Sequence, residues 1–266
     1  MSDTPMEPVL TVNRLSYRYP NGFQALQEIN FSIGLGETVG LVGPSGAGKS
    51  TLLMHLNGLL PETAQMVPVS DGSAAVHVAG LPVVRENLQE IRRLVGFLFQ
   101  DPDDQLFCPT VREDVAFGPL NLGLPREEVE RRITESLQAV GLDDYQHRST
   151  LQLSVGERKR VCLAGVFACS PALLALDEPT SNLDPRARKN LCRILDRFAG
   201  SQIIASHDLD LIVELCDRVV VLDKGQLHAH GLPETVLSDA ALMEQHGLEV
   251  PLRLRLRRQG QAPKSA

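Results

Sequence analysis

A glycine-rich stretch, GPSGAGKST at residues 43–51, has the spacing of a phosphate-binding loop. Its glycines let backbone N–H groups curl around a phosphate, Lys49 offers a positive charge to the terminal phosphates, and the Ser50 hydroxyl is a ligand for Mg²⁺. A glycine-rich turn that binds nothing is the alternative, but an apolar run precedes this stretch and a helical pattern follows it, as phosphate binding requires. The predicted nucleotide contacts are Gly43, Pro44, Ser45, Gly46, Ala47, Gly48, Lys49, Ser50 and Thr51.

Two carboxylates, Asp177 and Glu178, follow one another in the apolar run LLALDEP at residues 173–179. Carboxylates at the end of a buried strand are costly unless they handle a cation or a proton. Asp177 suits a hold on Mg²⁺ through water, and Glu178 suits the activation of a water that attacks the γ-phosphate. A solvated strand end is the alternative, and the phosphate loop weighs against it.

His207 follows a second apolar run, QIIA at residues 202–205. It would therefore emerge at the same carboxyl edge of the sheet as Asp177 and Glu178, where open α/β sheets bind ligands. The predicted role is a sensor of the γ-phosphate, and a purely structural histidine is the alternative.

A sheet with helices on its faces is needed to bring these residues together. Short apolar runs rich in Val, Ile or Leu predict strands within residues 9–15, 29–33, 37–43, 171–179 and 202–208, and a pair joined around Lys224 and Gly225 within 218–231. Leucine spacing predicts a helix over residues 48–60. Amphipathic helices with dense charge on one side are predicted within 126–142 and 157–168, and a last short helix within 233–248.

Composition limits the function classes. A chain of 266 residues with 43% hydrophobic residues is long enough for a large core, and its formal net charge of −7 argues against a dedicated nucleic-acid binder. Five cysteines without a CxxC pair predict neither a disulfide framework nor a zinc clip. No apolar run has transmembrane length, so work at a membrane would need a separate membrane-spanning partner.

The order of the motifs resembles that of ABC-type ATPases, the nucleotide-binding subunits of ABC transporters, across residues 8–235. LSVGE at 153–157 resembles the signature LSGGQ, SNLD at 181–184 resembles the D-loop, Gln100 lies at the Q-loop position, and Tyr19 at the adenine platform. The resemblance implies an ATPase that uses ATP and Mg²⁺. It makes Glu178, His207 and Gln100 catalytic, and Ser50, Gln100 and Asp177 the residues that hold Mg²⁺, the last through water.

The fold implied by the resemblance is α/β: a P-loop ABC ATPase with a RecA-like core, an N-terminal antiparallel β subdomain and an α-helical signature subdomain. The cassette would occupy residues 1–235, with its helical subdomain at about 105–168. Residues 236–266 would form a C-terminal helix and a basic tail, in which LRLRLRR at 252–258 is a candidate dimer or partner contact.

The signature supplies Ser154, Gly156 and a helix N-terminus, which together suit a phosphate. In the family, the signature of one subunit closes over the ATP held by the other, so the resemblance implies a homodimer that sandwiches two ATPs, with Ser154, Gly156 and Glu157 as further ATP contacts. Three residues depart from the family pattern: Val155 replaces a glycine and adds a Cβ, Glu157 replaces a glutamine, and Asn182 replaces the usual alanine of the D-loop.

FQDPDDQLF, residues 99–107, together with EDVAFGPLNLGLP at 113–125, most resembles the energy-coupling-factor branch, in particular ATPases of cobalt and nickel importers of the CbiO or NikO type. In that branch a transmembrane coupling subunit presents arginines, which Asp101, Asp103 and Asp104 would receive through charge-assisted hydrogen bonds, while Phe107 supplies an apolar floor. A solvated acidic loop is one alternative.

Direct binding of the substrate metal by these aspartates is a second, weaker alternative, because carboxylates without His or Cys match cobalt and nickel poorly. His228 and His230 of QLHAHG are likewise expected to be exposed strand residues rather than ligands. The resemblance places the metal in a substrate-binding membrane subunit.

The implied function is therefore the ATP-hydrolysing motor of a cobalt or nickel importer. It would lie at the cytoplasmic face of the inner membrane and touch the membrane only through its partners. A vitamin importer that shares an energy-coupling module is the nearest rival. A soluble ABC protein acting on ribosomes or DNA is less well supported, because the chain has one cassette, no coiled-coil insertion and net acidity.

Overall fold

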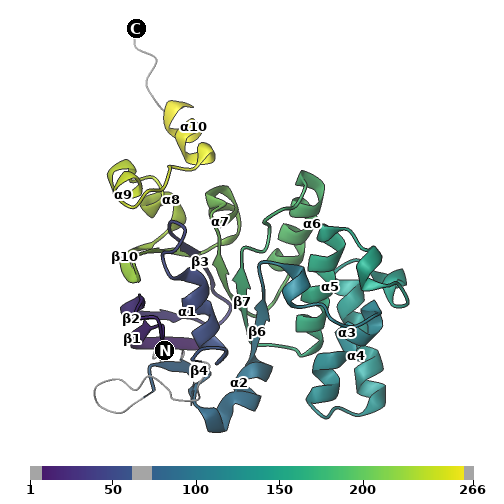
Figure 1. The fold of residues 1–266 in the computed structure, drawn as a ribbon. Helices are drawn as coiled ribbons and strands as arrows, with labels where there is room; N and C mark the ends of the chain where they lie inside the picture. The colour runs from purple at the N-terminus through teal and green to yellow at the C-terminus, as the bar shows by residue number, and fades with distance from the viewer. Residues whose placement is uncertain (1–7, 62–73, 261–266) are drawn as a thin grey trace, which may run out of the picture.

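The computed structural model describes residues 8–61 and 74–260, and two sheets form its centre (Figure 1). The larger sheet has five parallel strands and one antiparallel edge strand, β10. In spatial order its strands are β10 (Gln226–Gly231), β9 (Arg218–Asp223), β3 (Thr38–Val42), β8 (Ser201–Ala205), β7 (Leu173–Asp177) and β6 (Val95–Leu98).

The smaller sheet is antiparallel and formed by residues near the N-terminus. Its strands, in spatial order, are β2 (Gln24–Ile33), β1 (Leu10–Arg18), β4 (Val76–Val78) and β5 (Leu81–Pro82). Together with the parallel sheet and its helices, it confirms the predicted α/β class with an antiparallel N-terminal part.

Helices surround the large sheet, and α3, α4 and α5 lie together on the side opposite β1 and β2 (Figure 1). The helices are α1 (Lys49–Leu56), α2 (Leu88–Leu94), α3 (Val111–Asn121), α4 (Arg126–Ala139), α5 (Val155–Ala168), α6 (Pro185–Asp196), α7 (Leu209–Leu215), α8 (Pro233–Val236), α9 (Ala240–Gln245) and α10 (Leu252–Gly260). Short 3₁₀ turns are η1 (Arg85–Asn87), η2 (Pro102–Asp104), η3 (Asp143–Tyr145) and η4 (Thr150–Gln152). No helix in the described part of the chain is both long and apolar enough to cross a bilayer.

The central parallel strands β3, β7 and β8 are buried at every residue. This explains why they appear in the sequence as continuous apolar runs rather than as alternating patterns. Their carboxyl ends meet at one edge of the sheet, which places the loops after β3, β7 and β8 side by side.

Three sequence predictions about elements were wrong in detail. The helix predicted over residues 48–60 ends at Leu56, because the chain turns at Gly58 with a φ of +67°. The single helix predicted within 233–248 is divided into α8 and α9, and part of the predicted tail forms α10. The charged side chains of the helix predicted within 157–168 were expected to be exposed, but Lys159 is only 1% exposed.

Candidate functional site

The phosphate loop connects β3 to α1, and the side chain of Lys49 folds back onto carbonyl groups of the loop. Lys49 Nζ lies 2.8 Å from the Gly43 carbonyl oxygen and 3.1 Å from that of Pro44. Burial lowers the pKa of Lys49, against the opposing effect of the Glu178 and Asp177 carboxylates. The ammonium is therefore poised where a phosphate would lie.

Gly48 is the N-cap of α1 and adopts a φ of +106°, which side chains rarely allow. A Cβ at this position would come within 2.6 Å of the Ala25 carbonyl oxygen. At Gly43, a Cβ would come within 1.9 Å of the Leu222 carbonyl oxygen. Both glycines are thus required by the close packing of the loop between β2 and β9.

One cavity beside this loop joins the predicted catalytic residues, although they are far apart in the sequence. We call it the phosphate-loop half-site. The residues that line it are Phe23, Ser45, Gly46, Ala47, Gly48, Lys49, Ser50, Thr51, Gln100, Asp177, Glu178 and His207. Gly43, Pro44 and Tyr19, which were also predicted to contact the nucleotide, are not among them.

Asp177 lies at the end of β7, where its buried carboxyl accepts a hydrogen bond from the Ser50 side chain. Burial raises the pKa of Asp177, and the bond from Ser50 lowers it. A buried carboxylate beside a hydroxyl is a hard-oxygen pair of the kind that Mg²⁺ prefers. These two residues therefore fit the predicted magnesium site.

Glu178 and His207 are in direct contact. His207 Nδ1 lies 2.8 Å from Glu178 Oε2, and the same oxygen is 3.3 Å from both the Ser206 hydroxyl and the His207 backbone nitrogen. The His207 side chain is 72% exposed, whereas Glu178 is buried. Glu178 has a φ of +46°, a costly conformation for a residue with a Cβ and one typical of functional sites.

Lys159 is a buried residue that the sequence analysis took for surface charge. From α5, its Nζ lies 3.0 Å from the Glu178 carbonyl oxygen, 3.1 Å from that of Pro179 and 3.0 Å from the Ser181 hydroxyl. Burial lowers the pKa of Lys159 to about 8. It joins the signature helix to the backbone around the Glu178 carboxylate, and only its place within the charge run ERKR could have marked it in the sequence.

Two aromatic side chains lie near the phosphate loop. The Tyr19 hydroxyl is 3.0 Å from Thr51 Oγ1, and its ring packs edge-on against Tyr17 at 4.9 Å. Phe23, which the sequence analysis did not select, lines the cavity and is 58% exposed. Tyr19 remains the predicted adenine platform, and Phe23 is a second candidate surface for a base.

A second cavity contains the signature and shares no residue with the first; we call it the signature half-site. Its lining residues are Ser154, Val155, Gly156, Glu157, Arg160, Asn182, Leu183, Asp184, Arg186, Ala187 and Asn190. Ser154 is the N-cap of α5, where its hydroxyl lies 2.7 Å from Glu157 Oε2 and accepts a bond from the Glu157 backbone N–H. This is a complete capping box.

Glu157 is held in its ionised form by its neighbours. The Tyr145 hydroxyl donates a hydrogen bond of 2.6 Å to Glu157 Oε1, and Ser154 donates from its side chain and backbone. These bonds lower the pKa of Glu157 to about 2. A glutamine in this position would carry no charge, so the substitution places a fixed negative charge at the signature.

The other two departures from the family pattern fit the local backbone. Val155 is the first residue of α5 and does not have a positive φ, so its Cβ causes no backbone strain. Asn182 has a φ of +60°, a conformation that asparagine adopts more readily than alanine. Gly156 is retained where a Cβ would come within 2.9 Å of the Ala187 Cβ.

The acidic stretch has partners within the chain. Asp101 caps η2 by accepting a bond from the Asp103 backbone N–H, and the Asp103 carboxylate lies 2.5 Å from Arg158 Nη1. Asp104 is exposed. Of the three aspartates predicted to receive arginines from a partner, two thus already have hydrogen-bond donors, and their predicted coupling role stays a prediction.

An apolar groove lies beside this stretch. Phe107 is 64% exposed and packs edge-on against the exposed ring of Phe117, with centroids 4.7 Å apart. Both rings line the groove together with Leu106 and Asp114. Asp114 accepts a bond of 2.8 Å from the Cys108 backbone N–H, and burial raises the pKa of its carboxyl. Asp114 and Phe117 belong to the stretch EDVAFGPLNLGLP, which shares the resemblance, but they were not among the predicted coupling residues.

Comparisons with a family model, with related proteins and with a solved structure all indicate the same family. A family model described as ABC transporter matches residues 26–181. A putative ABC transporter ATP-binding protein of Gloeobacter violaceus is 48% identical over 94% of this chain and 99% of its own length. The energy-coupling factor transporter ATP-binding protein EcfA of Methanothermobacter thermautotrophicus is 46% identical over 91% of this chain and 77% of its own. The solved structure of cbiO1 from Clostridium perfringens, described as part of the ABC transporter complex cbiONQ, is similar with a TM-score of 0.77 and 34% identity, over 95% of this chain and 99% of that chain.

Proposed function

The chain belongs to the ABC transporter family as an ATP-binding subunit of the EcfA and CbiO type, and from this premise we propose that it powers the import of cobalt or nickel ions. The import would pass through a separate membrane complex. The similarity to cbiO1, a part of the ABC transporter complex cbiONQ, supports the role in a transporter, and the substrate class rests on the resemblance of FQDPDDQLF to the ATPases of cobalt and nickel importers.

The contact between Glu178 and His207 carries the catalytic part of the proposal. Glu178 is the buried carboxylate at the mouth of the phosphate loop, and as general base it would take a proton from the water that attacks the γ-phosphate. His207 orients this carboxylate through Nδ1 and remains exposed enough to meet the phosphate. Lys49 would neutralise charge on the phosphates during transfer.

Mg²⁺ would be held by Ser50, Gln100 and Asp177, where its charge offsets that of the triphosphate. Ser50 and Asp177 already hydrogen-bond to one another, and Gln100 lines the same cavity.

The two half-sites support a head-to-tail homodimer. They occupy two cavities on one chain that share no lining residue, which fits a nucleotide that meets Lys49 of one copy and Ser154 of another. Two copies related by a two-fold axis would instead enclose two ATPs, each between Lys49 of one copy and Ser154 of the other.

The groove around Phe107 supports coupling to a membrane subunit. It offers two exposed aromatic rings and the carboxyl of Asp114, next to the exposed carboxylate of Asp104. A short helix that carries arginine and apolar side chains would match this combination. The chain would thus act at the cytoplasmic face of the inner membrane through a coupling subunit and a substrate-binding subunit.

The ATPase of an energy-coupling-factor vitamin importer is the second candidate, and the similarity to EcfA favours it.

The test is to purify the chain from its native membrane with its partners, identify them, and measure cobalt and nickel uptake with wild-type chain and with Glu178→Gln. Loss of metal uptake in Glu178→Gln, with normal uptake in the exposed control Glu244→Gln, is the expected result. Unchanged metal uptake together with loss of vitamin uptake would move the assignment to the second candidate.

A further inference from the structure

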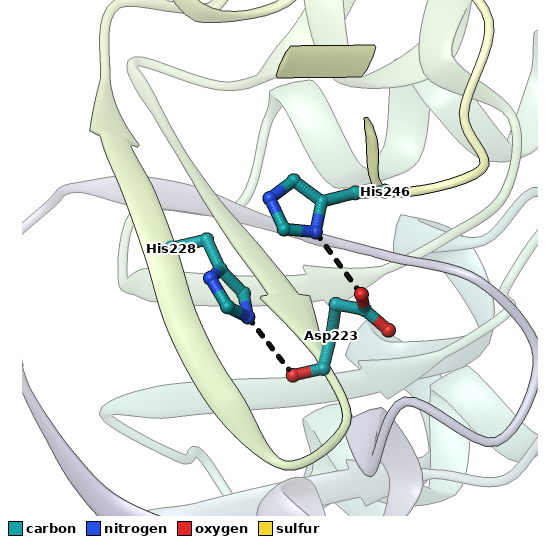
Figure 2. Close-up of side chains that lie close together, drawn as sticks. All are labelled: Asp223, His228 and His246. Atoms are coloured by element: carbon teal, nitrogen blue, oxygen red, sulfur yellow. Dashed lines mark hydrogen bonds and ion pairs between the residues drawn. The ribbon is translucent and has the colours of Figure 1, made fainter. Parts of the chain in front are cut away.

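Three residues outside both half-sites converge at the C-terminal side of the large sheet. Asp223 ends β9, His228 lies on the neighbouring strand β10, and His246 follows α9 (Figure 2). One potential ligand atom from each lies within 4.8 Å of the other two. Segments far apart in the sequence thus bring two imidazoles and one carboxylate together.

Both rings turn a nitrogen toward Asp223 (Figure 2). His246 Nδ1 lies 3.0 Å from Asp223 Oδ2, and His228 Nε2 lies 3.2 Å from the Asp223 carbonyl oxygen. The rings are 4.2 Å apart between centroids and tilted by 34°. His246 is 5% exposed, whereas His228 is exposed, so one ligand is fixed by packing and another faces solvent, which leaves an entry path.

We propose that Asp223, His228 and His246 form a binding site for a divalent first-row transition-metal ion such as Zn²⁺, Ni²⁺ or Co²⁺. Imidazole and carboxylate ligands suit these ions, and three protein ligands leave room for water in the remaining positions. Mg²⁺ and Ca²⁺ would bind more weakly, because they prefer sites made of oxygen atoms.

The geometry requires only a small closure. Zinc bonds of about 2.0–2.1 Å separate tetrahedral ligand atoms by about 3.3 Å. The widest pair in the cluster, at up to 4.8 Å, would therefore close by about 1.5 Å at most. Rotation of the exposed His228 ring can supply this movement, and the ion would replace the proton that now lies between His246 and Asp223.

The site also lies next to the phosphate loop. Two residues after Asp223, the Gly225 backbone N–H donates a bond of 3.0 Å to the Ala47 carbonyl oxygen. A bound ion would join the segment that carries His246 to the hairpin that holds this loop. Metal at this site should consequently reduce the local opening of the hairpin and of its bond to Ala47.

The site is independent of the proposed transport substrate, because it needs only these side chains. His228 was predicted to be an exposed strand residue rather than a ligand, and the structure confirms its exposure but gives it two neighbours with ligand atoms. His230, two residues along the same strand, is also exposed and is not part of the cluster, so it provides a matched control.

The test uses the purified full chain without nucleotide, stripped of metal and titrated with Zn²⁺ or Co²⁺ alone, in competition with a chromophoric chelator. We expect one tight equivalent for wild type, a loss of at least about tenfold in affinity for His228→Ala, and no change for His230→Ala. The absorption bands of bound Co²⁺ should report nitrogen and oxygen ligands, and should fade in His228→Ala. Because His228 is exposed, this variant should fold even if a change at buried His246 does not.

Equal affinity in wild type and His228→Ala, equal loss in His228→Ala and His230→Ala, or equally tight binding of Mg²⁺ would each overturn the site. Hydrogen exchange tests its link to the phosphate loop. Zn²⁺ should slow exchange at the Gly225 amide in wild type and not in His228→Ala. Unchanged exchange in metal-loaded wild type would overturn that link.

Discussion

In the phosphate-loop half-site, charged groups of opposite sign are held together in buried or partly buried positions, whereas in the signature half-site Ser154 and Glu157 already have partners within their own helix cap. Burial lowers the pKa of Lys49 and raises that of Asp177, and Glu178 has a φ of +46°. Ser154 and Glu157 satisfy each other in a capping box. The first half-site should therefore bind nucleotide alone, while the second should contribute only when a neighbouring chain presents a phosphate.

Among the tests of this difference, removal of the carboxylate from Glu178 should have the largest effect. Glu178→Gln should reduce ATP hydrolysis by about 10²- to 10⁴-fold, because general base catalysis typically contributes this much. Binding of ATP should persist, since Lys49 and the loop are unchanged. Phosphate release and nucleotide affinity measure the two effects, and hydrolysis at the normal rate would contradict the role of Glu178.

Acid should lower the free energy of unfolding through one buried histidine on the helix that follows the phosphate loop. His55 lies in the last turn of α1, the helix that follows the phosphate loop, where burial lowers its pKa from 6.5 to about 4 and Nε2 has no hydrogen-bond partner. Because the folded state resists protonation, stability from neutral His55 is complete above pH 6.5 and is lost as the pH falls toward 4. The full loss should be on the order of 3 kcal/mol.

The matched variant is His55→Leu, which cannot gain this charge. Urea unfolding at about pH 7, 5.5 and 4, roughly the ends and the middle of this window, should show a smaller loss of stability on acidification in the variant than in wild type. Glu157, with its pKa lowered from 4.5 to about 2, should add to the acid loss only below pH 4.5. Parallel stability curves for the two proteins would show that His55 does not carry the effect.

Nucleotide binding by the dilute chain compares the half-sites directly. Lys49→Ala should weaken ATP binding by about 10- to 100-fold, because a hydrogen bond to a charged group contributes about 1.5–3 kcal/mol. Ser154→Ala should leave the affinity of the dilute chain unchanged. Equal weakening in both variants would mean that the signature binds nucleotide without a second copy.

Helix α3 provides a control for the structural part of Ser154. Thr110 caps α3 with the same capping box, through Glu113, and lies outside both half-sites. Thr110→Ala and Ser154→Ala should each lower stability by about 1 kcal/mol. Only Ser154→Ala should also slow hydrolysis at concentrations that allow dimers, by about tenfold. Equal losses of hydrolysis in Thr110→Ala and Ser154→Ala would mean that Ser154 acts only as a helix cap.

The smallest effect concerns the D-loop. Asn182→Ala should cost up to about 1 kcal/mol of stability, because alanine tolerates the left-handed backbone less well than asparagine. Asn182→Gly should recover this loss, since glycine adopts a φ of +60° without strain. Thermal unfolding of the three proteins measures the difference, and an equal loss in both variants would assign the effect to the side chain.

The sequence predicted the elements that carry motifs better than those that do not. β3, β7 and β8 are buried apolar runs that end at a functional residue or one or two residues before one, so periodicity and chemistry agreed. β6 was missed, because Val95–Leu98 is a short apolar stretch that directly follows a helix and has no turn signal before it. β4 and β5 were also missed, since three and two residues give too little pattern.

Within the site, the sequence located single residues but not their long-range partners. Asp103 pairs with Arg158 of α5 across 55 positions, and Lys159 of the same helix reaches the Glu178 carbonyl oxygen after β7. Such contacts depend on how α5 packs against the sheet, which no local spacing encodes. Phe23 was missed for the same reason, because an exposed ring in a loop resembles any other surface aromatic until the cavity is formed.

The buried ammonium of Lys159 has a consequence for turnover in the proposed dimer. Its helix begins at the signature, and its ammonium donates hydrogen bonds to the carbonyl oxygens of Glu178 and Pro179 and to the Ser181 hydroxyl. If α5 rotates as it closes over a neighbour's ATP, the peptide bearing the water-activating side chain must move with it. Hydrolysis of the two ATPs should then be kinetically cooperative, because hydrolysis in one site changes the rate in the other.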